Sequence, residues 1–96
     1  MSKAYWVTCY RQITDPEKLA AYAKLAAPAI EAAGGKYLVR GLPVQAHEAG
    51  QMQRTVVIEF ETLQQAIATH DSPSYQMALA ALNGGVVRDL RIIGGV

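Results

Sequence analysis

Apolar and polar residues alternate most clearly over residues 54–61, where the sequence reads RTVVIEFE. A period of two is typical of a β-strand whose two faces have different surroundings. Val56, Ile58 and Phe60 form the more apolar set, so we expect helices to cover that face. Glu59 belongs to the opposite set and places a charge in the middle of the strand.

A first strand is predicted from Ala4 to Arg11, which is rich in aromatic and β-branched residues. Its two faces differ in character. One set is compact and is expected to lie under the helices: Tyr5, Val7 and Cys9. The other set has polar tips that would need partners if buried, so we expect it on the uncovered face: Trp6, Thr8 and Tyr10.

The segment after the first strand carries the signals of a helix. Thr14 or Asp15 can cap its start, and Pro16 stands in its first turn. Apolar residues then recur three and four positions apart, which is the spacing of one buried helical stripe. Gly34 and Gly35 follow and predict the end of the helix.

A second helical region is expected to be broken in the middle. Thr62 and Gln65 have the spacing of a capping box, which predicts the start of a short helix. The sequence Asp71-Ser72-Pro73 ends it, with Ser72 as the cap of another helix that stops at Gly84-Gly85.

Two further strands complete the pattern. Lys36 to Ala46 predicts a second strand that returns through a hairpin tip near Gly50 into the strand described first. A regular hairpin centred there sets Arg40 opposite Glu59. Val86 to Ile93 predicts the last strand, with Leu90 and Ile92 on one face and a second set on the other: Asp89, Arg91 and Ile93.

This order of elements predicts one α+β domain over residues 1–96, a ferredoxin-like βαββαβ plait. We expect an antiparallel sheet with strand order 4-1-3-2, both helical regions on one face and the other face uncovered. The uncovered face would be largely apolar, with Trp6, Thr8, Tyr10, Leu38, Leu42, Val57 and Ile93 beside Arg40, Glu59 and Arg91. Such a surface predicts a homodimer formed through the sheet faces.

Composition narrows the classes of function. The net charge is +1 with acids and bases interspersed, so no basic stripe favours nucleic acid. No stretch has the length and apolar character of a membrane span or a signal peptide, and we expect a cytoplasmic protein. Cys9 is the one cysteine, and a buried thiol is favoured over a nucleophile.

Arg40 and Glu59 are the leading candidates for chemistry. A guanidinium can hold a carboxylate or enolate, and a glutamate partly removed from water can exchange a proton with it. The alternative is a structural ion pair across the two strands, because an arginine opposite favours the ionised carboxylate. Trp6 and Tyr10 could wall a pocket for a flat ligand, or they could serve packing alone.

The two histidines are candidates for catalytic or metal-binding groups. His70 precedes Asp71 and could shuttle protons near neutral pH, or it could be a solvated residue at a helix end. His47 lies near the hairpin tip, and its spacing from the other histidine matches no metal-ligand pattern. We therefore expect no metal and no other cofactor.

Several segments resemble the small, mostly bacterial family called domain of unknown function 1330. They are AYWV, TDPEKLAAYAKLAAP, GGKYLVRG with the following proline, RTVVIEF, DSPSYQ and the dipeptide Arg88-Asp89. The resemblance covers nearly the whole chain. It implies the dimeric alpha-beta barrel superfamily, in which ferredoxin-like protomers pair sheet to sheet, and which includes monooxygenases, isomerases and ligand-sensing modules.

The resemblance also implies positions for a site. Arg40 matches the arginine that follows the hydrophobic residues of the family's second strand, and Glu59 matches its glutamate. Tyr75 belongs to the helix-break motif, with Ser72 and Pro73. The chain departs from the family pattern at Thr69-His70-Asp71, where an aromatic pair is usual, and at Leu82, where an arginine is usual.

Two functional hypotheses follow. In the first, the dimer encloses a pocket for a small organic acid or aromatic metabolite, with cofactor-free isomerase or monooxygenase-like chemistry. The expected catalytic residues are Glu59, Arg40 and His70, and the expected substrate-binding residues are Trp6, Tyr10, Tyr75 and Arg91. In the second hypothesis, the protein is a non-catalytic binding or interaction module, and Arg40 with Glu59 is a structural pair.

Overall fold

The computed structural model describes residues 2–96. Strands and helices follow each other in the order strand, helix, strand, strand, two helices, strand. Their bounds are β1 Ala4–Ile13, α1 Pro16–Ala32, β2 Lys36–Gly41, β3 Thr55–Phe60, α2 Leu63–Asp71, α3 Pro73–Leu82 and β4 Val86–Gly94. None of these helices has the length and apolar character needed to cross a membrane.

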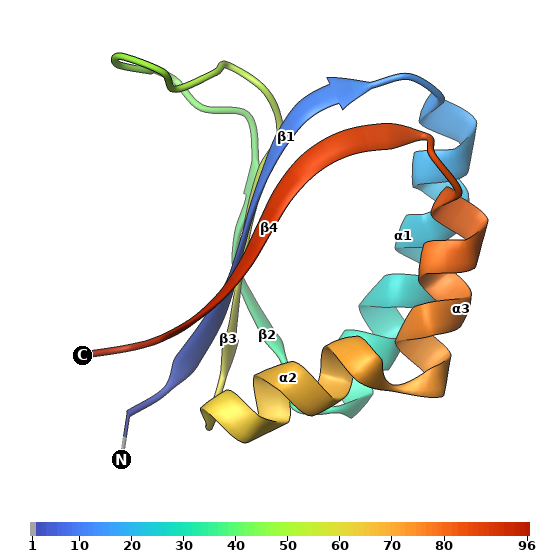
Figure 1. Cartoon of the computed structure of the whole chain (residues 1–96), viewed down its shortest axis with the longest axis vertical. Helices are drawn as coiled ribbons and strands as arrows, with labels where there is room; N and C mark the ends of the chain where they lie inside the picture. The colour runs from blue at the N-terminus through green and yellow to red at the C-terminus, as the bar shows by residue number, and fades with distance from the viewer. Residues whose placement is uncertain (1) are drawn as a thin grey trace.

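The strands form one antiparallel sheet in the order β2-β3-β1-β4. All the helices lie on one side of this sheet, and the other side is left open (Figure 1). The predicted order 4-1-3-2 is the same order read from the other edge. The predicted ferredoxin-like fold is therefore confirmed, and it leaves two sheet faces with different surroundings.

The predicted ends of α1 are confirmed. The Asp15 carboxylate accepts hydrogen bonds from the backbone N–H groups of Glu17 and Lys18 at 3.1 and 3.2 Å. These bonds satisfy donors that have no partner within the helix. Gly34 follows the last turn with φ of +93°, a conformation that strains residues with a side chain.

The helical break at Ser72 is also confirmed. Thr62 accepts a hydrogen bond from the Gln65 backbone N–H at 3.0 Å and starts α2. Ser72 accepts one from the Tyr75 backbone N–H at 3.3 Å and starts α3, with Pro73 as its first residue. The two caps place α2 and α3 at an angle to each other across the same sheet face (Figure 1).

The predicted faces of β1 are wrong. Trp6, Thr8 and Tyr10 are buried on the helix-covered side, whereas Cys9 is exposed on the open side. The polar tip of Trp6 finds a partner inside the core, because its indole N–H donates to the Ala66 carbonyl of α2 at 2.9 Å. Burial of a large ring whose N–H donor has a partner stabilises the fold more than burial of the opposite set, Tyr5, Val7 and Cys9, would.

The predicted register of β2 is also wrong. Arg40 lies opposite Val56, and Glu59 lies opposite Lys36. The register shifts within β2, and the connection to β3 is a long irregular loop instead of a tight hairpin. The shift turns Arg40 to the helix-covered face while Glu59 stays on the open face.

The faces of the other two strands agree with the prediction. Val56, Ile58 and Phe60 are buried under the helices. On β4, Leu90 and Ile92 pack against the core, with Arg88 on the same side. The open face therefore carries mainly Tyr5, Val7, Cys9, Val39, Val57, Glu59, Val87, Asp89, Arg91 and Ile93.

Candidate functional site

A cavity of about 40 Å³ lies between the helix-covered face of the sheet and α1. This volume has room for roughly two or three waters, so it can hold a small polar group. Its walls combine aromatic rings, small α1 side chains and arginines: Trp6, Thr8, Tyr10, Leu19, Tyr22, Ala23, Ala26, Ala27, Tyr37, Arg40, Arg54, Val56, Ile58 and Arg88.

Arginines from three positions of the sheet line this cavity. The β2 shift turns Arg40 toward it, and Arg88 lies opposite Tyr10 on the helix-covered face of β4. Arg54 precedes β3, where its backbone carbonyl accepts the Tyr10 N–H at 2.9 Å. Among residues 2–96, no aspartate or glutamate lines the cavity, so its side chains carry an excess of positive charge.

The guanidinium groups lie over aromatic rings. Arg54 and Arg88 lie 5.9 and 5.8 Å from the centroid of the Tyr10 ring. Arg40 lies 4.7 Å from the centroid of the Tyr37 ring. Ring faces stabilise a cation without neutralising it, and flat guanidinium groups held this way keep N–H donors for a further acceptor.

Arg54 has an unsatisfied donor. Its Nε atom is buried and has no hydrogen-bond partner within residues 2–96. A buried charged donor without a partner is costly, and such a group calls for a specific explanation. Arg54 is therefore a residue of the cavity wall whose hydrogen bonding is incomplete within residues 2–96.

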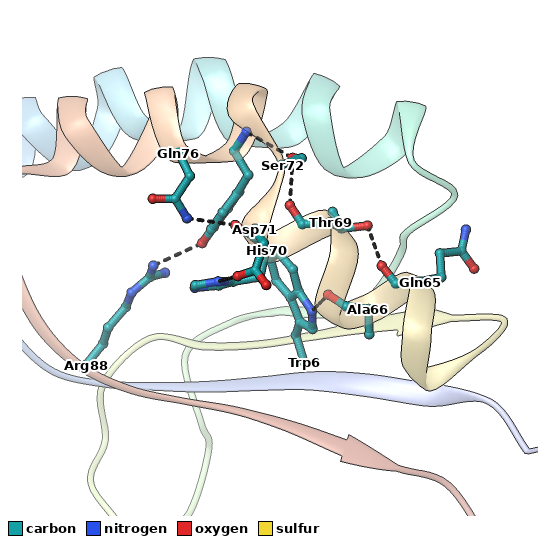
Figure 2. A network of polar contacts seen from close by, with 10 residues as sticks. Trp6, Gln65, Ala66, Thr69, His70, Asp71, Ser72, Gln76 and Arg88 are labelled. Atoms are coloured by element: carbon teal, nitrogen blue, oxygen red, sulfur yellow. Dashed lines mark hydrogen bonds and ion pairs between the residues drawn. The ribbon is translucent and has the colours of Figure 1, made fainter.

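Arg88 binds two tyrosines at once. Its two terminal nitrogens donate to the hydroxyl oxygens of Tyr22 and Tyr75 at 3.2 and 3.0 Å. The two hydroxyl groups are 2.7 Å apart and share a hydrogen bond. Figure 2 shows Arg88 directed from the sheet toward the helices. This cluster joins β4 to α1 and α3 beside the cavity.

The surroundings of this cluster change its proton affinities. Burial raises the pKa of the Tyr22 hydroxyl, and the neighbouring Tyr75 adds to the rise, so the phenol stays protonated. Burial by itself lowers the pKa of Arg88, but the two phenols outweigh it and the net direction is upward. Burial also raises the pKa of Tyr37. The cavity thus presents charged guanidinium groups and neutral phenols.

His70 lies outside the cavity wall. Its ring packs against Trp6 and Tyr75, with centroids 5.9 and 5.4 Å away, and its Nδ1 lies 3.2 Å from an Asp71 oxygen. The Gln76 side chain donates to its backbone carbonyl at 2.8 Å. Figure 2 shows His70 beside the indole of Trp6, so its contacts are those of a packed helix end.

Glu59 and Arg40 are not brought together. Glu59 lies on the open face, where Lys3 and the Tyr5 hydroxyl donate to its two oxygens at 3.2 Å each. The predicted pairing of Arg40 with Glu59, catalytic or structural, is therefore wrong. Arg91 is also on the open face and donates two hydrogen bonds to Asp89 at 3.0 Å.

The residues predicted for the site, catalytic or substrate-binding, divide between the two faces of the sheet. Trp6, Tyr10 and Arg40 line the cavity, and Tyr75 is part of the Arg88 cluster behind it. The sequence interpretation missed Arg54 and Arg88, together with Tyr22 and Tyr37. The alternation within the strands could have indicated the face of both arginines. Arg54 stands two residues before Val56 and Arg88 two residues before Leu90, so each lies on the same face as an apolar residue of the core.

A second hollow of about 310 Å³ lies beneath the loop between β2 and β3. It adjoins the open face through Cys9, Arg11 and Asp89, and loop residues from Pro43 to Gln53 form the rest of its wall. Within residues 2–96, no group of three or more His, Cys, Asp or Glu residues could hold a metal ion. The arginine-lined cavity is therefore the leading candidate site.

Comparison with family models assigns the chain. Residues 3–96 match the model described as domain of unknown function (DUF1330), and the chain belongs to this family. No curated protein matches the chain. The resemblance predicted from the sequence segments is confirmed.

Solved structures agree with the fold. RPA0582 from Rhodopseudomonas palustris, of unknown function, has a TM-score of 0.78 with 17% identity over 99% of this chain and 83% of that chain. SnoaB, described as a cofactor-independent oxygenase from Streptomyces nogalater, has a TM-score of 0.67 with 11% identity over 100% and 95%. A dimeric ferredoxin-like protein of unknown function from Thermobifida fusca has a TM-score of 0.61 with 14% identity over 99% and 91%. At these identities, the likeness shows the fold.

Proposed function

We propose that this protein binds a small organic acid in the cavity between the sheet and α1, with its carboxylate held by Arg40, Arg54 and Arg88. The observation that carries the proposal is the buried Nε of Arg54, which has no acceptor within residues 2–96. A carboxylate can accept from a guanidinium fork through two parallel hydrogen bonds. The neighbouring rings of Tyr10 and Trp6 give the rest of the ligand an apolar surface.

Binding is tested with the purified protein and small carboxylates. The probes are acetate, pyruvate and malonate, measured by isothermal titration calorimetry and by the fluorescence of Trp6. Trp6 is the one tryptophan of the chain and lines the cavity, so its emission reports what enters. We expect at least one carboxylate to bind at millimolar concentration or below.

Variants locate the binding. Arg54→Gln should lower the affinity for the tightest-binding carboxylate by roughly tenfold or more, because it removes a charge-assisted hydrogen bond worth about 1.5–3 kcal/mol. Arg91→Gln is the matched control, since it removes the same charge on the open face. If Arg54→Gln binds as tightly as the wild type, or if both variants lose equal affinity, the proposed site is wrong.

Cofactor-free catalysis is the second candidate, and the Arg88 cluster is the observation that favours it. Phenol and guanidinium donors can stabilise negative charge that develops on a ligand oxygen. Enolisation of a bound oxo acid would break a C–H bond, pass its proton to water and leave its electron pair in a new C=C bond, while the π pair of the carbonyl group moves onto the oxygen. The test is deuterium exchange at the methyl group of pyruvate in D₂O, followed by NMR. If deuterium exchange is no faster with the protein than without it, the catalytic candidate is wrong and ligand binding remains as the proposed function.

The open sheet face supports a homodimer. The chain exposes 6114 Å², whereas a folded monomer of 10.4 kDa exposes about 5,400 Å². The excess is close to the roughly 800 Å² that each partner loses in a standard interface. Val39, Val87 and Ile93 are exposed apolar residues of this face. A second copy of the chain, related by a two-fold axis, would cover the same patch on both protomers.

A further inference from the structure

Tyr22, Tyr75 and Arg88 form a hydrogen-bond cluster whose proton positions can be worked out. Each phenol has one O–H donor and can also accept. Arg88 has only donors, so both phenol oxygens accept from it. The 2.7 Å contact between the hydroxyls uses the proton of one phenol and leaves the proton of the other without an assigned acceptor.

Burial decides which phenol gives its proton to the other. Tyr75 is 0% exposed and does not line the cavity. Within residues 2–96, the hydroxyl of Tyr22 is the one acceptor that its O–H reaches. A buried O–H without an acceptor would cost free energy, so Tyr75 donates to Tyr22. Tyr22 lines the cavity, so its own proton, which Tyr75 does not use in this arrangement, is available to an acceptor placed in the cavity.

The geometry points to Tyr22 as a hydrogen-bond donor that selects organic acids carrying a second oxygen acceptor, above all 2-oxo acids. This inference rests on the proposed function, because the three arginines must hold the carboxylate first. A carbonyl oxygen next to the carboxylate would accept from Tyr22 within the same small cavity. Tyr22 itself is fixed by Arg88 and Tyr75, so little freedom is lost when the ligand binds.

Burial keeps this donor in its active form. The pKa of Tyr22 lies above its ordinary value, mainly because of burial, so the phenol retains its proton at neutral pH. A ligand without the second oxygen would leave the donor facing an apolar atom. Sites that present a buried donor discriminate strongly against analogues that lack the acceptor.

The inference is tested with matched pairs of small acids that differ by one carbonyl oxygen: pyruvate and propionate, and 2-oxobutyrate and butyrate. Each is titrated into the purified full-length protein at pH 7 by isothermal titration calorimetry. In at least one pair, we expect the wild type to bind the oxo acid about tenfold or more tightly than its parent acid, the effect of one good hydrogen bond.

Two variants assign that preference to Tyr22. Tyr22→Phe should bring the ratio of affinities in the pair close to one while the parent acid still binds. Tyr5→Phe is the matched control and should keep the preference, because it removes a phenol hydroxyl from the open face, where that hydroxyl donates to Glu59. If circular dichroism shows that Tyr22→Phe is unfolded, the double variant Tyr22→Phe/Tyr75→Phe replaces it. That variant contains no stranded phenol proton, and it should show the same loss.

The outcomes separate this inference from the proposed function. If no member of any pair binds, the carboxylate site itself is overturned, and the inference with it. If acids bind with equal affinity within every pair, the site stands and the role of Tyr22 is wrong. A preference that persists in Tyr22→Phe, or in its double variant, also overturns the inference.

Discussion

Arg54 shows how a single side chain can mark a site. Its guanidinium lies over the Tyr10 ring, a contact worth about 0.5–2 kcal/mol, and its buried Nε has no acceptor within residues 2–96. The ring stabilises the charge but cannot accept the N–H in the plane of the guanidinium. Arg88, in contrast, has both terminal nitrogens satisfied by Tyr22 and Tyr75. Arg88 therefore organises the wall, and Arg54 offers the free donor.

Tyr22 gives a prediction at the same scale. Its pKa is raised in the folded protein by burial, so its contribution to stability is complete below the ordinary tyrosine value near 10 and is lost as the pH rises toward the folded value. Above pH 10, the unfolded chain loses the Tyr22 proton first. Stability should then fall by up to about 1.4 kcal/mol per pH unit from this group.

Urea unfolding between pH 8 and 11.5 measures this effect. Tyr22→Phe should be less stable than the wild type at pH 8, and its stability should decline more slowly above pH 10. Parallel curves for the two proteins would show that Tyr22 contributes nothing to the alkaline loss of stability.

At the scale of elements, the register shift within β2 and the break at Ser72 shape the site. The shift brings Arg40 over the Tyr37 ring on the cavity side. The break ends α2 and starts α3, which carries Tyr75 to Tyr22 and Arg88. A continuous helix would give Tyr75 a different direction, so the cap at Ser72 positions the phenol cluster.

Ser72→Ala tests the importance of this cap. The Ser72 hydroxyl accepts from the Tyr75 backbone N–H and donates to the Thr69 carbonyl at 2.7 Å. Its removal should lower the free energy of unfolding by about 1 kcal/mol, the usual loss for an N-cap. Urea denaturation provides the measurement.

Ser74→Ala is the control for that experiment. Ser74 is exposed in the first turn of α3, and its hydroxyl lies 3.4 Å from that of Ser72. An exposed substitution away from a cap should change stability by less than about 0.5 kcal/mol. Equal effects of the two substitutions would contradict a capping role for Ser72.

At the scale of the whole molecule, the two faces of the sheet differ in character. Its helix-covered face holds the arginine-lined cavity, and its open face exposes valines and Ile93. Two cations of the open face are paired with acids: Lys3 with Glu59, and Arg91 with Asp89. Arg91 lowers the pKa of Asp89 through hydrogen bonds, so that pair stays ionised.

Val7→Lys tests the predicted dimer. Val7 lies opposite Val57 in the centre of the open face, and a buried lysine there would be costly on both protomers. We expect sedimentation velocity to find dimers for the wild type at 10 μM and mainly monomers for Val7→Lys. Circular dichroism should be unchanged, because the lysine is solvated in the single chain.

Val44→Lys is the matched control. Val44 lies in the loop between β2 and β3 and is 98% exposed. This variant should sediment as the wild type does. A monomeric wild type, or equal behaviour of the two variants, would rule out assembly through the open face.

The sequence alone determined the elements and their order. Local signals are sufficient for these features: Asp15, Thr62 and Ser72 cap helices through groups three residues away or fewer, and the strong alternation of β3 selects its own buried face. The same alternation contains Arg54 and Arg88 on the cavity side. The sequence therefore indicates the sheet face on which these arginines lie, but it does not show that they meet at one cavity.

Tertiary structure decided which face of β1 is buried and which residue faces Arg40. Trp6 can be buried because the Ala66 carbonyl, sixty residues away, accepts its N–H. The shift within β2 follows from pairing with β3 across a long loop, so no local pattern sets it. Both depend on contacts between residues distant in sequence, and these contacts turned Arg40 and Tyr10 toward one cavity and left Glu59 on the other side of the sheet.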